Sequence, residues 1–211
     1  MVDDKTNVAK LIEQISSKKP DLVEFRLDKL HELRLLEEIV NTISFPVIAA
    51  DKSNRGTIAT LELLSHAAAA GFDMVDIELS AASSNPIVNK LKSHGSEVII
   101  SSHDYSRTPS SEELRKVLQG EKKAGADVCK VVTTAINPSD NLTILGFVEG
   151  ESANTRLVSF AMGAHGIPSR VLSPWFGAEF TFAAISEESK TADGQLSVDA
   201  LRMVWQALGI Q

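Results

Sequence analysis

Residues 97–133 read EVIISSHDYSRTPSSEELRKVLQGEKKAGADVCKVVT, in which two β-branched runs flank a longer run of helical period. Such an order predicts a strand, a crossover helix and a second, parallel strand. Two local signals support the helix, because Ser110 stands before Glu112 and Glu113 as an N-terminal cap and Gly125 follows as a left-handed cap. The stretch therefore predicts one βαβ unit.

The same alternation continues outward in both directions, and alternating strands and helices indicate an α/β fold with a parallel sheet. With 211 residues, the chain is expected to form a single catalytic domain, 1–211, built as a (β/α)8 TIM-type barrel. Strands are predicted at Asp21–Arg26, Pro46–Ala50, Met74–Leu79, Glu97–His103, Asp127–Thr133, Arg156–Met162 and roughly Ala178–Ala183. Helices are predicted near Val8–Ser17, Leu30–Thr42, Thr57–Ala70, Pro86–Ser93, Ser111–Ala124, Pro138–Glu149 and Val198–Leu208.

The beginning of the chain leaves little room for the eighth strand of such a barrel. The missing strand would have to precede the first predicted helix, where only Met1 to Asp4 remain. We therefore expect the first strand to be short or missing. A doubly wound open sheet is the structural alternative. Its usual phosphate-binding turn of closely spaced glycines does not follow any of the predicted strands.

The composition and charge of the chain argue against membrane and nucleic-acid partners. Hydrophobic residues make up 43% and charged residues 23%, and the longest apolar run, Ala67 to Phe72, is too short for a bilayer, so no membrane partner is expected. The net charge of −7 argues against nucleic-acid binding, which needs a basic surface. Met1–Lys5 lacks the features of a secretory signal, so we expect a cytoplasmic protein. Cys129 is the single cysteine and is interpreted as a core residue.

Polar side chains recur near the ends of the predicted strands. Side chains alternate faces along a strand, so Glu24 and Arg26 share one face, as do Ser101 and His103. In the strand VCKVV, Lys130 points away from Cys129 and its neighbour Val131. We expect the polar groups to meet at the mouth of the barrel.

Lys130 and His103 each have two interpretations. A lysine within a strand usually extends its charged tip to solvent, but one buried in a barrel is expected to lose its proton and become a nucleophile. His103 alone is more often a hydrogen-bonded core histidine, yet imidazole also suits a group that takes and returns a proton. Their joint placement favours catalysis. The other histidines show no metal-ligand spacing, so no metal is expected.

Two later segments add candidate binding residues. Arg170 follows the glycine-rich turn after the strand that ends at Met162. It is either a solvated loop residue or a group placed to bind a carboxylate with two parallel hydrogen bonds. The polar segment Thr191–Gln195 is either an ordinary loop or a lid.

Several of these motifs, taken in order, resemble the type I 3-dehydroquinate dehydratases, the Schiff-base enzymes of the shikimate pathway. The matching segments, which lie between residues 21 and 196, are Glu24-Phe-Arg-Leu-Asp28, Ser101-Ser-His-Asp104 with Thr108-Pro109, Cys129-Lys-Val131, Met162 with Ser169-Arg170, and Thr191-Ala-Asp-Gly-Gln195.

The resemblance implies a lyase that converts 3-dehydroquinate to 3-dehydroshikimate and water. It implies an imine on Lys130 and general acid and base catalysis by His103. It also implies that no cofactor is needed and that the protein is a homodimer, for which Trp175, Phe176 and Trp205 are candidates for the interface or for the core. The substrate-binding residues implied are Glu24, Arg26, Lys52, Met162, Arg170, Phe182, Thr191 and Gln195.

The chain departs from the family pattern after its second predicted strand. There the family carries an arginine and then a glutamate followed by two glycines, whereas this chain reads Ala50-Asp-Lys-Ser-Asn-Arg-Gly56. Lys52 replaces the arginine, and the carboxylate that would partner His103 is either Glu24, Glu78 or absent.

Two rival functions stay open at this point. A class I aldolase also uses a barrel lysine and an imine, and Gly163 with Gly166 offers a weak version of the phosphate-binding turn that most aldolases carry. The second rival is a non-catalytic barrel that binds a small acid or another subunit.

Overall fold

The computed structural model describes residues 5–29, 34–53, 56–82 and 85–210. The chain divides into two compact units. Unit 1 comprises Met1–Ile100 and Ala124–Asp127, and unit 2 comprises Ser101–Lys123 and Val128–Gln211. The single catalytic domain stays a prediction.

The strands of the described residues pair in the order in which they occur in the chain, β1-β2-β3-β4-β5-β6. Pairs β1–β2, β2–β3 and β5–β6 are parallel. This order is the one that a (β/α)8 barrel has, whereas a doubly wound sheet reverses its strand order part-way. The predicted parallel α/β fold is therefore confirmed. The strands are β1 Val23–Arg26, β2 Val47–Ala50, β3 Met74–Glu78, β4 Glu97–His103, β5 Val128–Thr134 and β6 Leu157–Met162.

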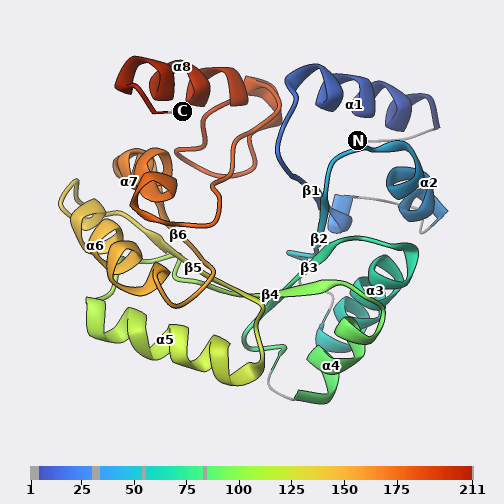
Figure 1. Cartoon of the computed structure of the whole chain (residues 1–211), viewed down its shortest axis with the longest axis horizontal. Helices are drawn as coiled ribbons and strands as arrows, with labels where there is room; N and C mark the ends of the chain where they lie inside the picture. The colour runs from blue at the N-terminus through green and yellow to red at the C-terminus, as the bar shows by residue number, and fades with distance from the viewer. Residues whose placement is uncertain (1–4, 30–33, 54–55, 83–84, 211) are drawn as a thin grey trace. The chain divides into compact units, whose positions relative to one another are not determined.

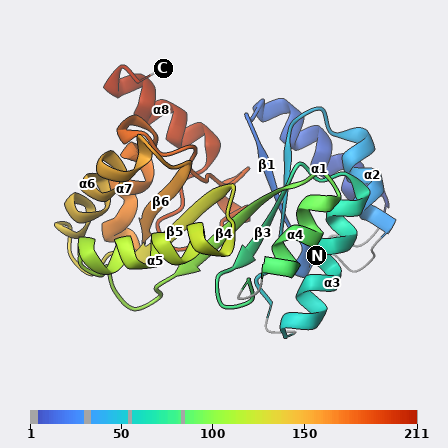
Figure 2. The same cartoon turned by 60° about the horizontal axis from the view of Figure 1, so that its bottom comes forward.

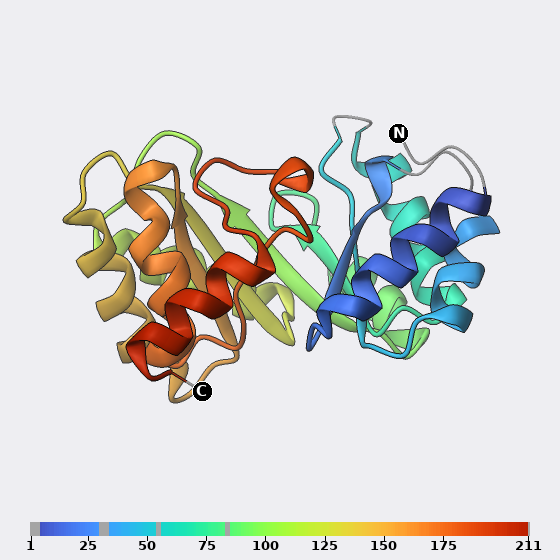
Figure 3. The same cartoon turned by 90° about the horizontal axis from the view of Figure 1, so that it is seen from above.

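In unit 1, helices connect β1, β2 and β3, and α3 packs on β2 and β3 (Figure 1). Figure 3, seen from above, shows α1 beside β1, and α2 packs on α1. The β2 strand is buried along its whole length, and Phe25 meets Phe72 edge-on with ring centroids 6.2 Å apart. Because strands buried on both faces must be apolar throughout, VIAA suits this position. The helices are α1 Lys5–Lys18, α2 Arg34–Thr42, α3 Thr57–Ala70 and α4 Asn85–Ser93.

In unit 2, α5, α6 and α7 lie beside the β5–β6 pair (Figure 2), and α8 packs on α7. The predicted cap of α5 is confirmed as a capping box, because the Ser110 backbone N–H donates to Glu113 Oε2 at 2.9 Å and the Glu113 N–H donates to Ser110 Oγ at 3.3 Å. The helices are α5 Ser111–Ala124, α6 Asp140–Ser152, α7 Ile167–Leu172 and α8 Val198–Leu208.

Most predicted elements agree with the structure. The bounds of β4, α3, α5 and α8 are as predicted, and the other matching elements differ by a few residues at their ends. The expected short or missing first strand falls on residues 1–4, which lie outside the described residues. No helix of the described part of the chain is long and apolar enough to cross a membrane.

The predicted strand Ala178–Ala183 is wrong. The segment carries no regular ladder; Glu179 N–H donates to Leu157 O at 2.8 Å, and an isolated bridge joins Ala184 to Ser197. Its alternation of Phe180 and Phe182 arises because both rings gather in an aromatic cluster. Sequence reasoning also missed α7, a single short helix that begins beside Pro168.

Candidate active site

The β5–β6 pair brings one set of side chains to the same face in unit 2. In the parallel register, Lys130 lies opposite Val158, Val132 opposite Phe160 and Thr134 opposite Met162. Residues opposite one another point to the same side of a sheet, so Lys130, Phe160 and Met162 share a face. Cys129 and Val131 point to the other side, as the sequence predicted.

Lys130 is buried against aromatic rings, with only 4% of its surface exposed. Its Nζ lies 4.3 Å from the ring centroid of Phe182. Phe182 in turn meets Phe160 at 6.1 Å and Phe180 at 5.5 Å, both edge-on. The predicted strand lysine is therefore buried beside aromatic rings rather than extended into solvent.

Arg170 contacts the same aromatic cluster through another ring and is 2% exposed. Its guanidinium carbon lies 4.1 Å from the centroid of Phe160. The Nε and Nη2 atoms are buried and donate no hydrogen bond to any group that the structure describes. Burial lowers the pKa of Arg170 to about 10, which still leaves it charged at neutral pH. A buried, charged fork with free donors is suited to receive an anion.

His103 is the last residue of β4, and the chain that follows it is tied to β5. The Asp104 N–H donates to Val132 O at 2.9 Å, and Thr134 Oγ1 donates to Asp104 O at 2.9 Å. The His103 ring stacks on Tyr105, with centroids 5.8 Å apart. These bonds fix the end of β4 beside the strand that carries Lys130.

The segment Thr191–Gln195 is attached to the end of β6. The Gly163 N–H, next to Met162, donates to Asp193 O at 3.1 Å. Gln195 is 9% exposed, and its Oε1 accepts from the Thr191 N–H at 2.8 Å. Gly194 has a φ of +74°, and a Cβ placed on it would lie 2.3 Å from Gly163 O. Glycine is therefore required here by backbone conformation and by space.

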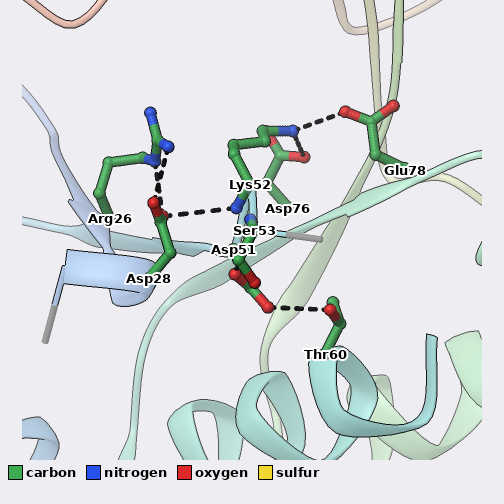
Figure 4. Close-up of polar contacts among 8 residues, drawn as sticks. All are labelled: Arg26, Asp28, Asp51, Lys52, Ser53, Thr60, Asp76 and Glu78. Atoms are coloured by element: carbon green, nitrogen blue, oxygen red, sulfur yellow. Dashed lines mark hydrogen bonds and ion pairs between the residues drawn. The ribbon is translucent and has the colours of Figure 1, made fainter. Parts of the chain in front are cut away.

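Unit 1 carries a second polar cluster at the ends of its strands, shown in Figure 4. Lys52 Nζ contacts Asp76 Oδ1 at 3.0 Å and Glu78 Oε1 at 2.9 Å. Burial acts to lower the pKa of Lys52, but the charges of Asp76 and Glu78 outweigh it and raise the pKa. Arg26 donates two hydrogen bonds to Asp28, at 2.8 and 2.9 Å. Both cations therefore have carboxylate partners that the sequence did not predict.

The face of β5 opposite Lys130 is closed to solvent. Cys129 is buried, as predicted for a core residue. Burial raises the pKa of its thiol to about 12, with a smaller contribution in the same direction from Glu121 on α5. A thiol of this kind is unreactive at neutral pH.

Comparison with known proteins gives a consistent result. The Type I 3-dehydroquinase family profile matches residues 1–211. The chain belongs to the type I 3-dehydroquinase family.

The chain is 35% identical over 207 residues to the 3-dehydroquinate dehydratase of Methanosarcina barkeri, covering 89% of this chain and 85% of that protein. The 3-dehydroquinate dehydratase of Pyrococcus abyssi is 31% identical over 209 residues, 96% of this chain and 94% of that protein. The crystal structure of 3-dehydroquinate dehydratase from Geobacillus kaustophilus superposes with a TM-score of 0.89 at 24% identity, covering 99% of this chain and 88% of that one. The latter similarity establishes the fold, so the TIM-type barrel class is confirmed.

In this type I 3-dehydroquinase, unit 2 contains seven of the predicted site residues. Its aromatic cluster places Phe182 between Lys130 and Phe160, and Phe160 meets Arg170. Phe160 was not predicted from the sequence. A signal was available, because Phe160 lies two positions before Met162 on the same strand, and side chains two positions apart share a face. Those in unit 2 are His103, Lys130, Met162, Arg170, Phe182, Thr191 and Gln195; those in unit 1 are Glu24, Arg26 and Lys52.

Proposed function

We propose that the chain dehydrates 3-dehydroquinate to 3-dehydroshikimate through an imine on Lys130, with His103 as general acid and base. Family membership makes it a type I 3-dehydroquinate dehydratase, a hydro-lyase. The observation that carries the mechanism is the burial of Lys130 against the Phe182 ring. Imine formation requires a primary amine that is held away from bulk solvent and can add to a ketone, and a lysine is the residue that supplies one.

The reaction proceeds in balanced steps. The Lys130 amine adds to the substrate ketone, and loss of water leaves a protonated imine. The iminium acidifies the adjacent carbon, His103 removes a proton from it, and the electrons pass into an enamine. They then expel the hydroxyl on the next carbon, which leaves as water with the proton returned by the imidazolium. Hydrolysis of the imine restores the Lys130 amine and releases the product.

Arg170 is the proposed partner of the substrate carboxylate. Its buried donors match the two oxygens of a carboxylate, and a charge-assisted pair of this type is about twice as strong as a neutral one. Phe182 and Met162 would pack against the carbocyclic ring, and Thr191 and Gln195 would contact hydroxyls. The contacts expected of Glu24, Arg26 and Lys52 stay predictions, as does the choice between Glu24 and Glu78 as partner of His103.

Borohydride trapping tests this proposal. Borohydride reduces an imine to a secondary amine, so the protein treated with 3-dehydroquinate should carry a covalent adduct on Lys130. Lys130→Ala should give no adduct and almost no turnover, while Lys116→Ala, which removes an exposed helix lysine, should behave as the unmodified protein. His103→Ala should still form some adduct but turn over slower by on the order of 10²–10⁴.

The outcomes also separate the rival functions. An adduct on another lysine, or full activity without His103, would overturn the mechanism. Adduct formation without a rise in the absorbance of the conjugated product would indicate a binding protein. Release of a carbon fragment instead of water would indicate an aldolase.

We also propose that the enzyme acts as a cytoplasmic homodimer. Trp175 is 64% exposed, as an interface residue would be in the separated chain. Trp205, by contrast, donates its Nε1 hydrogen to Val171 O at 2.8 Å and so helps attach α8 to α7. Sedimentation of Trp175→Ser beside the unmodified chain tests the dimer, because an interface tryptophan should weaken self-association when removed.

A further inference from the structure

Asn141 is a buried amide in the first turn of α6, with 4% exposure. The positions that follow it in the helix interior are filled by apolar residues such as Ile144 and Leu145. A polar group buried in such surroundings is costly unless its hydrogen-bonding capacity is used. Asn141 therefore needs hydrogen-bond partners that offset the free-energy cost of burying its amide.

The Asn141 side chain binds three backbone groups. Its Nδ2 donates to Pro138 O at 2.8 Å and to His165 O at 2.7 Å, and its Oδ1 accepts from the Ser169 N–H at 2.8 Å. Two carbonyls on one side and an N–H on the other leave a single orientation of the amide that satisfies all three.

Two of these partners flank the turn that leads into α7. His165 lies in the 3-10 turn Ala164–Gly166, and Ser169 is the residue immediately before Arg170. The Ser169 hydroxyl completes the turn, because its Oγ accepts from the Ala161 N–H at 3.0 Å and donates to Gly166 O at 2.9 Å. Asn141 thus holds the backbone at two points that immediately precede Arg170 in the chain.

We propose that Asn141 is a positioning residue for Arg170, acting through the Ser169 N–H and the His165 carbonyl. This inference rests on the proposed function, in which Arg170 binds the substrate carboxylate. The guanidinium has no described hydrogen-bond partner at Nε or Nη2, so its placement over Phe160 depends on the backbone that carries it. Without Asn141 the turn relaxes, because the buried Ser169 N–H and the part-buried His165 carbonyl lose their partner.

The test is a double-mutant cycle between Asn141→Ala and Arg170→Ala. We expect Asn141→Ala to raise KM for 3-dehydroquinate by roughly five- to tenfold, part of the roughly 10²-fold that a misplacement of about 1 Å can cost, with kcat changed less than about threefold. In the Arg170→Ala background the same substitution should change KM less than about twofold, because the group that it positions is gone. Ser96→Ala, which removes a buried hydroxyl bonded to Phe72 O, is the control for loss of a buried polar contact in unit 1.

Each outcome decides one point. A KM increase that persists in the Arg170→Ala background, or that equals the effect of Ser96→Ala, overturns the inference. Normal KM in Asn141→Ala together with a large loss in Arg170→Ala also overturns it and leaves the proposed function standing. Normal kinetics in Arg170→Ala overturns both. Asn141→Asp keeps the acceptor for Ser169 but removes the donors to Pro138 and His165, and it is judged by the same criteria if the alanine variant does not fold.

Discussion

Replacing Gly194 by alanine is expected to damage catalysis as well as the fold. Two penalties add at this position. A φ of +74° is a left-handed conformation, which costs a residue with a Cβ roughly 1–2 kcal/mol. The added Cβ would also lie 2.3 Å from Gly163 O, whereas ordinary contact begins at 3.4 Å. The segment that carries Thr191 and Gln195 must therefore move by about 1 Å.

A displacement of that size has a predictable effect on rate. Misplacing substrate-contacting groups by about 1 Å costs up to roughly 10²-fold, so kcat/KM of Gly194→Ala should fall by a factor of about 30 to 100. The assay is the initial rate of appearance of the conjugated product over a range of 3-dehydroquinate concentrations. Urea unfolding of the same variant gives the loss in free energy of unfolding.

Gly209 provides a matched control. Its φ is +70°, nearly that of Gly194, but nothing lies within 4 Å of the position that a Cβ would occupy. Gly209→Ala should therefore lose roughly 1–2 kcal/mol of stability and keep its kcat/KM. Equal kcat/KM in the two variants would refute the reasoning, because the close approach of Gly194 to Gly163 would then have no consequence for the site.

Three further predictions follow from the same contacts. Arg170→Ala should lower kcat/KM by at least about 2 kcal/mol, roughly thirtyfold, and unchanged kinetics would remove Arg170 from the substrate site. Lys52→Met leaves the buried Asp76 carboxylate without the Lys52 cation and should lower the free energy of unfolding in urea by roughly 3 kcal/mol, most of which Asp76→Asn should restore. Because the pKa of Lys52 is raised, the stabilisation should be present at neutral pH and, on the alkaline side, be lost only as the pH rises above about 10.5; a loss at neutral pH would contradict the ion pair. Cys129, buried and with its pKa raised to about 12, should react with an aromatic disulfide reagent only in denaturant, so rapid labelling of the native protein would show that β5 opens.

Elements with strong local signals could be predicted from the sequence. Ser110 with Glu113 begins α5 through contacts three residues apart, so sequence and structure agree there to the residue. The segment Ala178–Ala183 was predicted wrongly because alternation of large apolar residues is also produced by rings that converge on one cluster, as Phe180 and Phe182 do. Helix α7 was missed because it is a single short helix after a glycine-rich turn, and Pro168 was the available signal.

The residues of the candidate site divide in the same way. Lys130 was predictable because face alternation is a property of any strand, and its environment was not, because Phe182 reaches it from 52 positions further along the chain. Lys52 was expected as a cation for the substrate, but the carboxylates of Asp76 and Glu78 come from a different strand. Contacts between distant segments depend on how the strands are arranged in space, and they cannot be deduced from local patterns in a single sequence.

The proposed nucleophile and the proposed substrate-binding residues lie on different parts of the chain, and this separation affects how substrate preference can change. In the proposed mechanism the imine-forming amine stands on β5, and Cys129 lies buried on the opposite face of that strand, so the nucleophile belongs to the core of unit 2. Arg170 and the Thr191–Gln195 segment belong to connections that follow β6. Exchange of those connections can therefore be used to select other small ketones, with different acidic groups or ring substituents, while the covalent chemistry is inherited unchanged. A library randomised only in these connections, screened by borohydride adducts against a panel of cyclic ketones, would exploit that separation.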